Sequence, residues 1–517
     1  MTPVTKILFA VALAWPAAVQ AEAPVTTSWG TIAEPAYPAH ICATLPAGLT
    51  ARVGSIDAYD ADGRDTHPDQ VRLQAAIDGC TGGAVKLVAG PEGEDAFLSG
   101  PLTLKSGVVL WIDRGVTLFA SRDPADYDKG AGDCGTANMS TVKSCRSLIE
   151  GRDLVDSGLV GDGTIDGRGG SLLLSGPNAG KRSWWDVAWQ TKQGLTQHNF
   201  RLVQIDGGRN FTLLRLTFEN SPNFHIVPND VDGITAWGIK ILTPSPVYAP
   251  PGYACMDGTT PDVRTPAVCF TPETVKNTDG FDPGNSRHVL LAYSYISTGD
   301  DNVAIKAGQG ALSQHQAYVH NHFYYGHGMS IGSETDGGVD DIVVSDLVLD
   351  GMDSPGGNGL RIKSDPSRGG KVTGVVFENV CMRNEVRPMV FDTAYSDKTG
   401  VLYPDFADVT VRNFHYVGSA KYGGGTLVFR GYPGRPIGLK LETVVFDGPQ
   451  PVVTGGKGKD RPFGVHFTVM PGATGFAALL TPSVADDVTV EYQETRSSPG
   501  LRDCSGAFEP FVDTGEN

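Results

Sequence analysis

Acidic side chains recur in the sequence at a spacing that suits acid–base chemistry. Asp279 and Asp301 are 22 positions apart, and Asp300 precedes Asp301 in the string Gly-Asp-Asp-Asn. If the chain forms coils of that length, stacked strands about 4.8 Å apart would bring these carboxyl groups together. Repulsion between neighbouring carboxylates raises the pKa of at least one of them, so one group can hold a proton while another accepts one. The spacing therefore predicts a site for general acid–base catalysis.

Two further motifs place a histidine and two cations in the same part of the chain. His327 lies between glycines, and Arg361, Ile362 and Lys363 are consecutive. In a strand, alternation puts Arg361 and Lys363 on one face and Ile362 on the other, toward a core. Two cations on a face that also carries carboxylates predict an anionic ligand. A uronic acid meets this requirement, because a neutral sugar would leave the cations unexplained.

Each of these motifs has a simpler interpretation when it stands alone. Asp300, Asp301 and Asn302 are typical of a turn whose side chains bond to the backbone, and clustered carboxylates also suit a calcium ion. His327 is compatible with a turn as well, and Arg361 with a solvated strand face. One polar motif per coil, repeated on consecutive coils, favours a shared catalytic site over these separate interpretations. The site is predicted to need no metal and no cofactor.

Charge and composition limit the classes of ligand and fold. The 517 residues include 58 acidic and 41 basic side chains, which gives a formal net charge of −17. A field of that sign repels nucleic acid and anionic membranes, so neither is predicted as a partner, and an acidic polymer would need a local basic cluster. Glycine (66 residues) and proline (34 residues) are abundant. This composition favours many short strands joined by tight turns.

The N-terminus has the pattern of a secretion signal. Lys6 is followed by an apolar run over residues 7–19, and small residues surround Gln20, where a signal peptidase would cut. The run is too short to span a bilayer, which argues against an anchor. The sequence predicts a signal peptide over residues 1–21 and a secreted, extracellular protein that contacts no membrane.

All eight cysteines lie after the predicted cleavage point, and an even number in an exported chain favours disulfide bonds. They form no C-x-x-C pair with clustered histidines, so a zinc site is not indicated. Short separations favour Cys134 with Cys145 and Cys255 with Cys269. The sequence leaves open how the other four cysteines pair: Cys42, Cys80, Cys381 and Cys504.

Short apolar runs closed by Gly, Asn or Asp recur along most of the chain. Two of them begin 23 residues apart, at Asn210 and Gly233, and periods of this size are typical of a solenoid. One strand per turn favours a parallel β-helix over a sandwich or a propeller, which strand content alone would also allow. The runs expected to form strands span residues 108–112, 211–218, 234–242, 289–296, 342–349, 372–380 and 409–417.

The predicted organisation is an all-β chain with one solenoid and a few additions. Residues 22–50 show no clear element and are interpreted as an N-terminal extension, and residues 51–517 as a parallel β-helix catalytic domain. A short helix is expected over residues 68–80, where it would cap the first coil. The Pro-rich segment 243–272 is interpreted as a loop inserted into one coil, where it would wall one end of a binding groove.

The ordered motifs resemble those of glycoside hydrolase family 28, the polygalacturonases. The sequence carries Asn-Thr-Asp at 277–279, Gly-Asp-Asp at 299–301, Gly-His-Gly at 326–328 and Arg-Ile-Lys at 361–363, in that order. The resemblance covers most of the chain from about residue 52 onward. Further similar stretches are GDDNVAIK (299–306), GHGMSIGSE (326–334), LSGPLTLKS (98–106), NSPNFHI (220–226) and the pair Trp184 and Trp185.

The resemblance implies a right-handed parallel β-helix that hydrolyses α-1,4 links between galacturonic acid units, with inversion and without a metal. Asp300 would be the general acid that protonates the leaving oxygen. Asp279 and Asp301 would together activate water on the opposite face of the sugar. His327 would neighbour the acid and help hold its proton.

The resemblance also assigns substrate contacts. Arg361 and Lys363 would bind the substrate carboxylate next to the scissile bond, and Tyr395 would lie at the sugar-binding face or else be a core or rim aromatic. Asn277 is included among the substrate-binding residues, although it is expected mainly to orient its turn. His225 and the two tryptophans are assigned to packing or stacking.

The main departure from the family pattern is the insertion 243–272, because extra loops near the groove can turn internal cleavage into terminal cleavage. Endo action is still expected, since the rest of the chain lacks an appended domain or several large insertions. The alternatives are an exo-polygalacturonase, a calcium-dependent pectate lyase and a non-catalytic pectin-binding solenoid. We expect a monomer that acts on polygalacturonate or pectin. The number of sugar subsites and the tolerance of methyl esters stay open.

Overall fold

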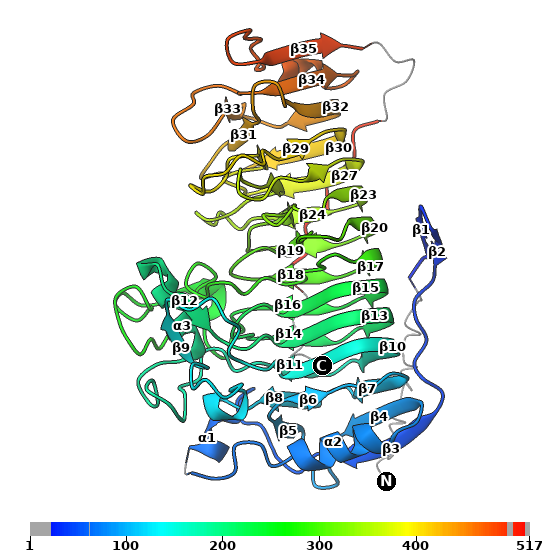
Figure 1. The fold of residues 1–517 in the computed structure, drawn as a ribbon, viewed down its shortest axis with the longest axis vertical. Coiled ribbons are helices and arrows are strands. Elements are labelled where there is room, and N and C mark those ends of the chain that lie inside the picture. The colour runs from blue at the N-terminus through cyan, green and yellow to red at the C-terminus, as the bar shows by residue number, and fades with distance from the viewer. Residues whose placement is uncertain (1–21, 62, 494–499, 512–517) are drawn as a thin grey trace, which may run out of the picture.

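Parallel strands stacked coil upon coil dominate the fold, as the solenoid pattern predicts. The computed structural model describes residues 22–61, 63–493 and 500–511, and the predicted signal peptide lies outside them. Coils rise from the N-terminal end to the C-terminal end along the long axis of the molecule (Figure 1). The chain is a right-handed parallel β-helix, and its strands form three columns that run along this axis.

The first column is the longest and holds the strands that pair across nearly every coil. Asn210 and Gly233, the two positions 23 residues apart, occupy equivalent places because their neighbours Phe211 and Ile234 are paired. The strands of this column are β3 (Ile41–Pro46), β4 (Gly83–Val88), β7 (Val108–Ile112), β10 (Ile149–Gly161), β13 (Val203–Leu214), β15 (Ile226–Trp237), β17 (Arg287–Ala292), β20 (Ser313–Val319), β23 (Val339–Ser345), β26 (Lys371–Val372), β27 (Val375–Arg383), β29 (Asp405–Phe406), β30 (Val409–Gly418), β32 (Ile437–Phe446), β34 (Val465–Val469) and β35 (Val488–Tyr492).

The second column is made of short strands that follow the first column after a sharp corner. It continues into the last residues of β27, with which β24 pairs. Its strands are β5 (Ala96–Ser99), β8 (Thr117–Ala120), β11 (Thr164–Asp166), β14 (Thr217–Glu219), β16 (Lys240–Leu242), β18 (Tyr295–Ser297), β21 (His322–Phe323) and β24 (Val348–Asp350).

The third column carries the chemistry described below. Its N-terminal half consists of β6 (Leu102–Thr103) and the first residues of β10, β13 and β15. Phe281 links the halves, because it pairs with Ile226 on one side and with Val303 on the other. The C-terminal half is a separate sheet of six strands: β19 (Val303–Ile305), β22 (Met329–Ile331), β25 (Leu360–Lys363), β28 (Met389–Asp392), β31 (Thr426–Arg430) and β33 (Val452–Thr454).

The side chains that point inward from the three columns form one continuous core. Alternation produces it, since every second residue of a strand faces the interior and meets the equivalent residue of the next coil. Phe391 lies between Phe377 and Phe429, with ring centroids 6.1 and 5.8 Å away, and Phe467 follows at 5.5 Å from Phe429. Aromatic pairs at such distances contribute about 0.5–1.5 kcal/mol each beyond the area they bury.

Several runs expected to be single strands bend at a corner between the first and second columns. The runs 108–112 and 409–417 are confirmed as β7 and β30, whereas 211–218, 234–242, 289–296 and 342–349 each divide into two strands. Each corner uses a residue with left-handed backbone, a conformation in which only glycine is free of strain. These corner residues are Arg215, Gly238, Tyr293, His320 and Asp346, with φ of 61°, 63°, 54°, 57° and 53°. Four of these five corner residues are not glycine, so the amino-acid types at these positions did not predict that the chain turns there.

Residues before position 50 contain strands that the sequence did not indicate. The strands β1 (Val25–Thr27) and β2 (Gly30–Ile32) form an antiparallel hairpin. The next strand, β3, pairs in parallel with β4, so residues 41–46 belong to the solenoid. The sequence did not predict these strands, because Pro and Ala are frequent in the segment and each strand of the hairpin is only a few residues long.

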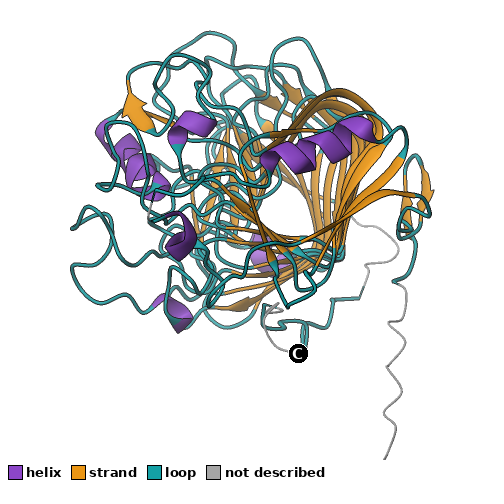
Figure 2. Cartoon of the chain, turned by 90° about the horizontal axis from the view of Figure 1, so that it is seen from below, coloured by secondary structure: helices purple, strands orange, loops and turns teal. Residues whose placement is uncertain are grey.

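The helix expected over residues 68–80 is present as α2 (Gln70–Gly79), and it buries Leu73 and Ile77 in the core cluster. Figure 2 shows α2 lying in front of the strand columns when the molecule is viewed from its N-terminal end. The described part of the chain holds no helix that is both long and apolar enough to cross a bilayer. The remaining short elements are α1 (Asp57–Asp60), α3 (Trp184–Trp189), α4 (Thr474–Ala477), three 3-10 turns (Pro124–Asp126, Gln190–Gln193 and Pro251–Tyr253) and the paired strands β9 (Thr136–Asn138) and β12 (Thr196–His198).

Four disulfide bonds use all eight cysteines. The two local pairs that the spacing favours, Cys134–Cys145 and Cys255–Cys269, are both confirmed. The structure also settles the open pairs, which are Cys42–Cys80 and Cys381–Cys504. Two of the bonds join a solenoid strand to a segment near one end of the chain, and the other two each close a loop on itself.

Candidate active site

The register of the third column brings the predicted acidic residues together. Phe281 pairs with Val303, and Val303 pairs with Met329. Two positions earlier in the three coils lie Asp279, Asp301 and His327, which therefore occupy equivalent places one above another. The backbone confirms this alignment, because the amide of Gly280 donates to the carbonyl of Asp301 at 2.9 Å. The spacing of 22 residues thus corresponds to one coil, as the sequence predicts.

Asp300 is the most accessible carboxyl group of the three aspartates. Its side chain is 19% exposed, against 6% for Asp279 and 2% for Asp301. The ring Nδ1 of His327 lies 2.9 Å from Oδ1 of Asp300, and the backbone amide of His327 donates to the carbonyl of Asp300. The backbone amide of Asn277 also donates to Oδ2 of Asp300 at 3.3 Å. Asp300 is therefore held by its neighbours while one part of it reaches solvent.

Arg361 and Lys363 point to the same side of β25, and Ile362 lies in the core between them. Lys363 Nζ is 2.6 Å from Oδ2 of Asp301, and a terminal nitrogen of Arg361 is 3.2 Å from Oδ1. The hydroxyl of Ser330 donates to the same Oδ1 at 2.9 Å. The sequence assigns both cations to a substrate carboxylate, and in the structure they also neutralise Asp301.

An exposed tyrosine lies beside the cationic pair. The ring centroid of Tyr395 is 5.3 Å from the guanidinium of Arg361 and 5.5 Å from Nζ of Lys363. The tyrosine is 39% exposed. An anionic group bound beside this tyrosine would lie close to both positive charges.

Two charged residues that the sequence did not assign complete the cluster. Lys306 Nζ lies 2.5 Å from Oδ2 of Asp282 and 3.6 Å from Oδ2 of Asp279. Lys306 ends the string Gly299 to Lys306 that resembles the family, and Asp282 follows Asp279 by three positions. The sequence pointed to Asp282 and Lys306 only through their closeness to the recognised motifs. In the structure the backbone of Gly284 pairs with that of Lys306, and this pairing brings the side chains of Asp282 and Lys306 together.

The three aspartates differ in their proton affinity. Burial raises the pKa of Asp279 well above its usual range, and the nearby carboxylates of Asp282 and Asp300 raise it further. Burial would also raise the pKa of Asp300, but the positive field of His327, Lys363 and Arg361 outweighs it and lowers that pKa. The pKa of Asp301 is likewise lowered by Lys363 and Arg361 against the effect of burial. In the free site, Asp279 is therefore the group that keeps a proton longest.

Asp300, Asp301 and His327 also satisfy the geometry of a metal site, since each offers a ligand atom within 4.8 Å of the others. The residues around them do not favour a cation. Lys363 and Arg361 already occupy both oxygens of Asp301, and their charges would repel a divalent ion. The donor set suits proton transfer better than metal binding.

His225 supports Asp279 from below. Its Nδ1 lies 3.0 Å from the carbonyl oxygen of Asp279, and its Nε2 lies 2.7 Å from the hydroxyl of Thr243. A carbonyl can only accept, so Nδ1 carries the proton and Nε2 accepts from the hydroxyl. Burial lowers the pKa of His225 to about 4, which keeps the ring neutral. The sequence assigns His225 to packing, and the structure shows that it also positions the backbone of a site residue.

Asn277, just before the site, is held by Gln197 on β12, a strand outside the three columns. The amide nitrogen of Gln197 donates to Oδ1 of Asn277 at 2.9 Å, and the backbone φ of Asn277 is 56°. Asparagine tolerates this left-handed conformation better than most residues. Asn277 therefore shapes the turn that precedes Asp279, in agreement with the orienting role expected from the sequence.

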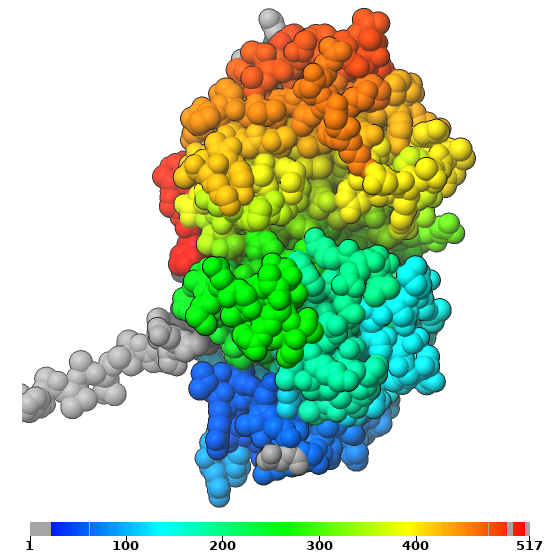
Figure 3. Space-filling model, turned by 90° about the vertical axis from the view of Figure 1, so that its left-hand side faces the viewer, coloured from blue at the N-terminus to red at the C-terminus, as the bar shows by residue number. Residues whose placement is uncertain are grey.

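The insertion 243–272 packs firmly against α3. The ring of Trp185 contacts Tyr248 and Phe270 at centroid distances of 5.3 and 4.9 Å, and its Nε1 donates to the carbonyl of Ser221 at 2.9 Å. Directly after the insertion, the carboxylate of Glu273 accepts from the hydroxyl of Ser354 at 2.9 Å. Figure 3 shows the green insertion beside the teal and cyan loops on this side of the molecule. The insertion is therefore anchored to α3, and the residue that follows it, Glu273, is tied to Ser354.

Comparisons with known proteins agree with these motifs. The sequence profile of the family described as glycosyl hydrolases family 28 matches residues 80–436. A polygalacturonase of Ralstonia nicotianae is 56% identical over 98% of this chain and 97% of its own length. An endo-polygalacturonase of Pectobacterium carotovorum is 43% identical over 66% of this chain and 76% of its own. The solved structure of polygalacturonase from Erwinia carotovora covers 85% of this chain and 99% of its own, with 36% identity and a TM-score of 0.67.

Replacing Asp279 by asparagine should stabilise the fold at neutral pH. The folded protein must keep a proton on Asp279 that the unfolded chain loses above about pH 4, so the cost to stability grows as pH rises. We expect Asp279→Asn to raise the free energy of unfolding at pH 7 by about 1–2 kcal/mol and by less at pH 4. Unfolding followed at the two pH values measures this difference.

Asp301→Asn is the matched contrast. The lowered pKa of Asp301 contributes stability above about pH 4 that is lost as pH falls, so this variant should be less stable than the wild type at pH 7. Equal effects of the two substitutions, in sign and in pH dependence, would contradict the assignment of their ionisation states.

Proposed function

The chain belongs to glycosyl hydrolase family 28, and we propose that the cluster around Asp300 is its catalytic site. The protein is a hydrolase of polygalacturonate and pectin that cleaves galacturonosyl links. Family membership also sets aside the lyase and the non-catalytic solenoid that the sequence left open. The observation that carries the site assignment is the stacking of Asp279 and Asp301 next to Asp300, beside the cationic pair of Arg361 and Lys363.

Asp300 donates a proton to the leaving oxygen in the proposed mechanism. Its greater exposure and its hydrogen bond with His327 support this role, because the two groups can hold one proton between them. The low pKa of Asp300 in the free site works against proton donation. A substrate carboxylate bound at Arg361 and Lys363 offsets the positive field of those residues, and this raises the pKa of Asp300 when the acid is needed.

Asp279 and Asp301 activate the attacking water. As water adds to the anomeric carbon, one of its protons passes to this pair while the bond to the leaving oxygen breaks and that oxygen takes the proton of Asp300. Asp301, whose pKa is lowered, is the member of the pair that is ionised and accepts the proton. Asp279, whose pKa is raised, keeps its own proton and holds the water by a hydrogen bond. Attack opposite the leaving group inverts the anomeric configuration, which is the outcome that the family resemblance implies.

Arg361 and Lys363 bind the carboxylate of the galacturonate unit next to the scissile bond. Both cations lie close to the exposed ring of Tyr395, so their charges attract an anionic group that binds beside it. Tyr395, exposed beside both cations, covers the sugar ring, and Asn277 lines the opposite side. The local positive charge makes an anionic polymer acceptable to a protein whose net charge is −17.

Asp300→Asn tests the assignment of the acid. The substitution keeps the size of the side chain but removes the transferable proton, and general acid catalysis contributes about 10²- to 10⁴-fold. We expect release of reducing ends from polygalacturonate to fall by at least about 10²-fold. Turnover within a few-fold of the wild type would reject Asp300 as the acid, provided that the variant has the unfolding midpoint of a folded protein.

We also propose internal, endo-type cleavage. The endo-acting relative shares 43% identity with this chain, whereas an exo-poly-alpha-D-galacturonosidase of Dickeya chrysanthemi shares 27%.

Chromatography of early digestion products separates the two modes. An endo enzyme should release a ladder of oligogalacturonates while the viscosity of the polymer falls rapidly. Monomer or dimer alone from the first minutes, with viscosity nearly constant, would show exo cleavage.

We further propose that the protein is secreted as a monomer without residues 1–21. Four disulfide bonds support an oxidising destination. All proposed site residues come from one chain, so no second copy is needed to complete the site. Protein recovered from the culture medium should begin at residue 22 by mass spectrometry and elute at the mass of one chain. An intact N-terminus or intracellular retention would contradict this proposal.

A further inference from the structure

A buried glutamate that the mechanism above does not use lies two coils beyond His327. Met329 pairs with Leu360, and Leu360 pairs with Met389, so the segment before β28 follows the segment before β25 in the stack. Glu385 belongs to the segment before β28 and is only 1% exposed. One of its carboxyl oxygens, Oε2, is buried and has no hydrogen-bond partner among the described residues. The carboxyl group is therefore enclosed by protein.

The carboxyl group of Glu385 lies against the loop 351–359, which belongs to the coil between Glu385 and His327. Two glycines of this loop leave the space that the carboxyl group fills. A Cβ atom added to Gly357 would be 2.5 Å from Oε2 of Glu385, and one added to Gly351 would overlap Oε1. The loop and the glutamate therefore fit together only because these two positions carry no side chain.

The same loop also faces His327. Ser354 and Gly356 border a small pocket that His327 lines from the other side. A Cβ atom on Gly356 would be 3.5 Å from Nε2 of His327, whereas Nδ1 of the ring holds the carboxyl group of Asp300. The loop is thus the layer between Glu385 and the histidine that holds the proposed acid.

Hydrogen bonds tie the loop to the segment around Glu385. Arg387 donates from Nε to Oδ1 of Asn358 and from a terminal nitrogen to the carbonyl of Gly356, each at 2.9 Å. The hydroxyl of Tyr416 fixes the backbone of Glu385, because it donates to the carbonyl of that residue at 2.8 Å and accepts from its amide at 3.1 Å. A shift of Glu385 is therefore passed on to the loop.

The charges that face Glu385 favour its uncharged form. Burial raises the pKa of Glu385 well above its usual range, Asp350 and Asp353 raise it further, and Arg387 lowers it. Arg387 is engaged with the loop, and Asp350 is paired with Arg383 at 2.6 Å. An uncharged carboxyl group can lie at this place without a cation of its own, whereas an ionised one would be costly.

We propose that Glu385, in its uncharged form, is a positioning residue for His327, because it fills the space under the loop 351–359 and keeps Gly356 against the imidazole ring. His327 in turn holds the carboxyl group of Asp300 at 2.9 Å. The geometry of the proposed acid therefore depends on a residue that touches neither the substrate nor the reacting atoms. The proposal rests on the proposed function and deepens it.

Glu385→Ala and Glu385→Gln test this role on polygalacturonate. Alanine leaves a space under the loop, and a misplacement of about 1 Å can cost about 10²-fold in rate. We expect kcat of Glu385→Ala to fall by about 10-fold and KM to change by less than about 2-fold, because the cations that bind the substrate carboxylate stay in place. Glutamine has nearly the same shape and no charge, so kcat of Glu385→Gln should stay within about 2-fold of the wild type.

Glu378→Gln is the matched control. Glu378 lies on β27, and its carboxylate pairs with the exposed Arg412 rather than with the loop. The variant loses one negative charge, as Glu385→Gln does, and it should keep the kcat and KM of the wild type.

Gly357→Ala approaches the same contact from the loop. The added Cβ would press on Oε2 of Glu385 and separate the loop from it, so kcat should fall as it does in Glu385→Ala. In the double variant Gly357→Ala/Glu385→Ala the carboxyl group is absent, so the glycine substitution should cost less than it does alone. Losses that simply add would overturn this contact as the source of the effect. If Glu385→Ala does not fold, the comparison of Gly357→Ala with Glu385→Gln still decides.

The unfolding midpoint measures the ionisation of Glu385. The folded protein keeps a proton on Glu385 that the unfolded chain loses above about pH 4, so the cost to stability grows as pH rises. Glu385→Gln should therefore raise the midpoint at pH 8 and raise it less at pH 4. An equal shift at the two pH values would overturn the uncharged form.

Three kinetic results would overturn the positioning role while leaving the hydrolase intact. They are a wild-type kcat in Glu385→Ala, an equal loss in Glu385→Gln and Glu385→Ala, and a raised KM with unchanged kcat. An equal loss in the control variant would likewise assign the effect to net charge alone. A wild type that releases no reducing ends from polygalacturonate would instead contradict the proposed function itself.

Discussion

The coils stack about 4.8 Å apart, and everything that the protein does at this site follows from that spacing. Each strand residue therefore lies next to the equivalent residue of the neighbouring coil. In the interior the constraint is favourable, because Phe391 and Phe429 are paired in register and their rings pack against each other. On the third column the same constraint places Asp279 directly beside Asp301, where two carboxyl groups share a site that is almost closed to water.

Neighbouring cations reduce the repulsion that these carboxyl groups have for one another when they ionise. Lys306 compensates Asp279 and Asp282, and Lys363 compensates Asp301. The compensation is uneven, which is why one carboxyl group has a raised pKa and another a lowered one. A substrate carboxylate that enters this balance changes it, so the ionisation of the site depends on whether the ligand is present.

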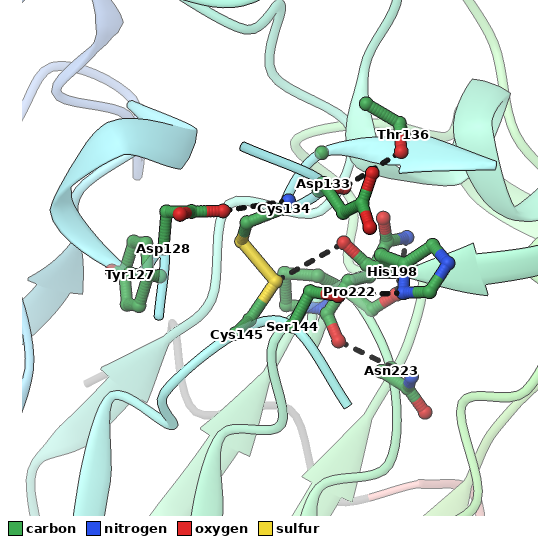
Figure 4. Close-up of a disulfide and its surroundings, with 12 residues drawn as sticks. Tyr127, Asp128, Asp133, Cys134, Thr136, Ser144, Cys145, His198, Pro222 and Asn223 are labelled. Atoms are coloured by element: carbon green, nitrogen blue, oxygen red, sulfur yellow. Dashed lines mark hydrogen bonds between the residues drawn. A yellow bond between two sulfur atoms is a disulfide. The ribbon is translucent and has the colours of Figure 1, made fainter. Parts of the chain in front are cut away.

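The loops provide the features that differ from one coil to the next. The coils present similar rows of side chains along the whole third column, whereas the loops on this side differ in length and are fastened individually. Cys134–Cys145, which Figure 4 shows with its surroundings, and Cys255–Cys269 each close one such loop. The stacked coils therefore place the charged side chains of the site, and the loops around them are held by separate contacts.

The sequence by itself determined the solenoid, the four ordered motifs, the two local disulfides and the alternation that separates Ile362 from its charged neighbours, because these depend on spacing within short segments. Only the tertiary structure decided the corners at residues such as Arg215, the strand before residue 50 and the pairing of Lys306 with Asp282. It also decided which aspartate keeps its proton. Those features depend on burial and on contacts between coils, and neither quantity is defined until the chain has stacked on itself.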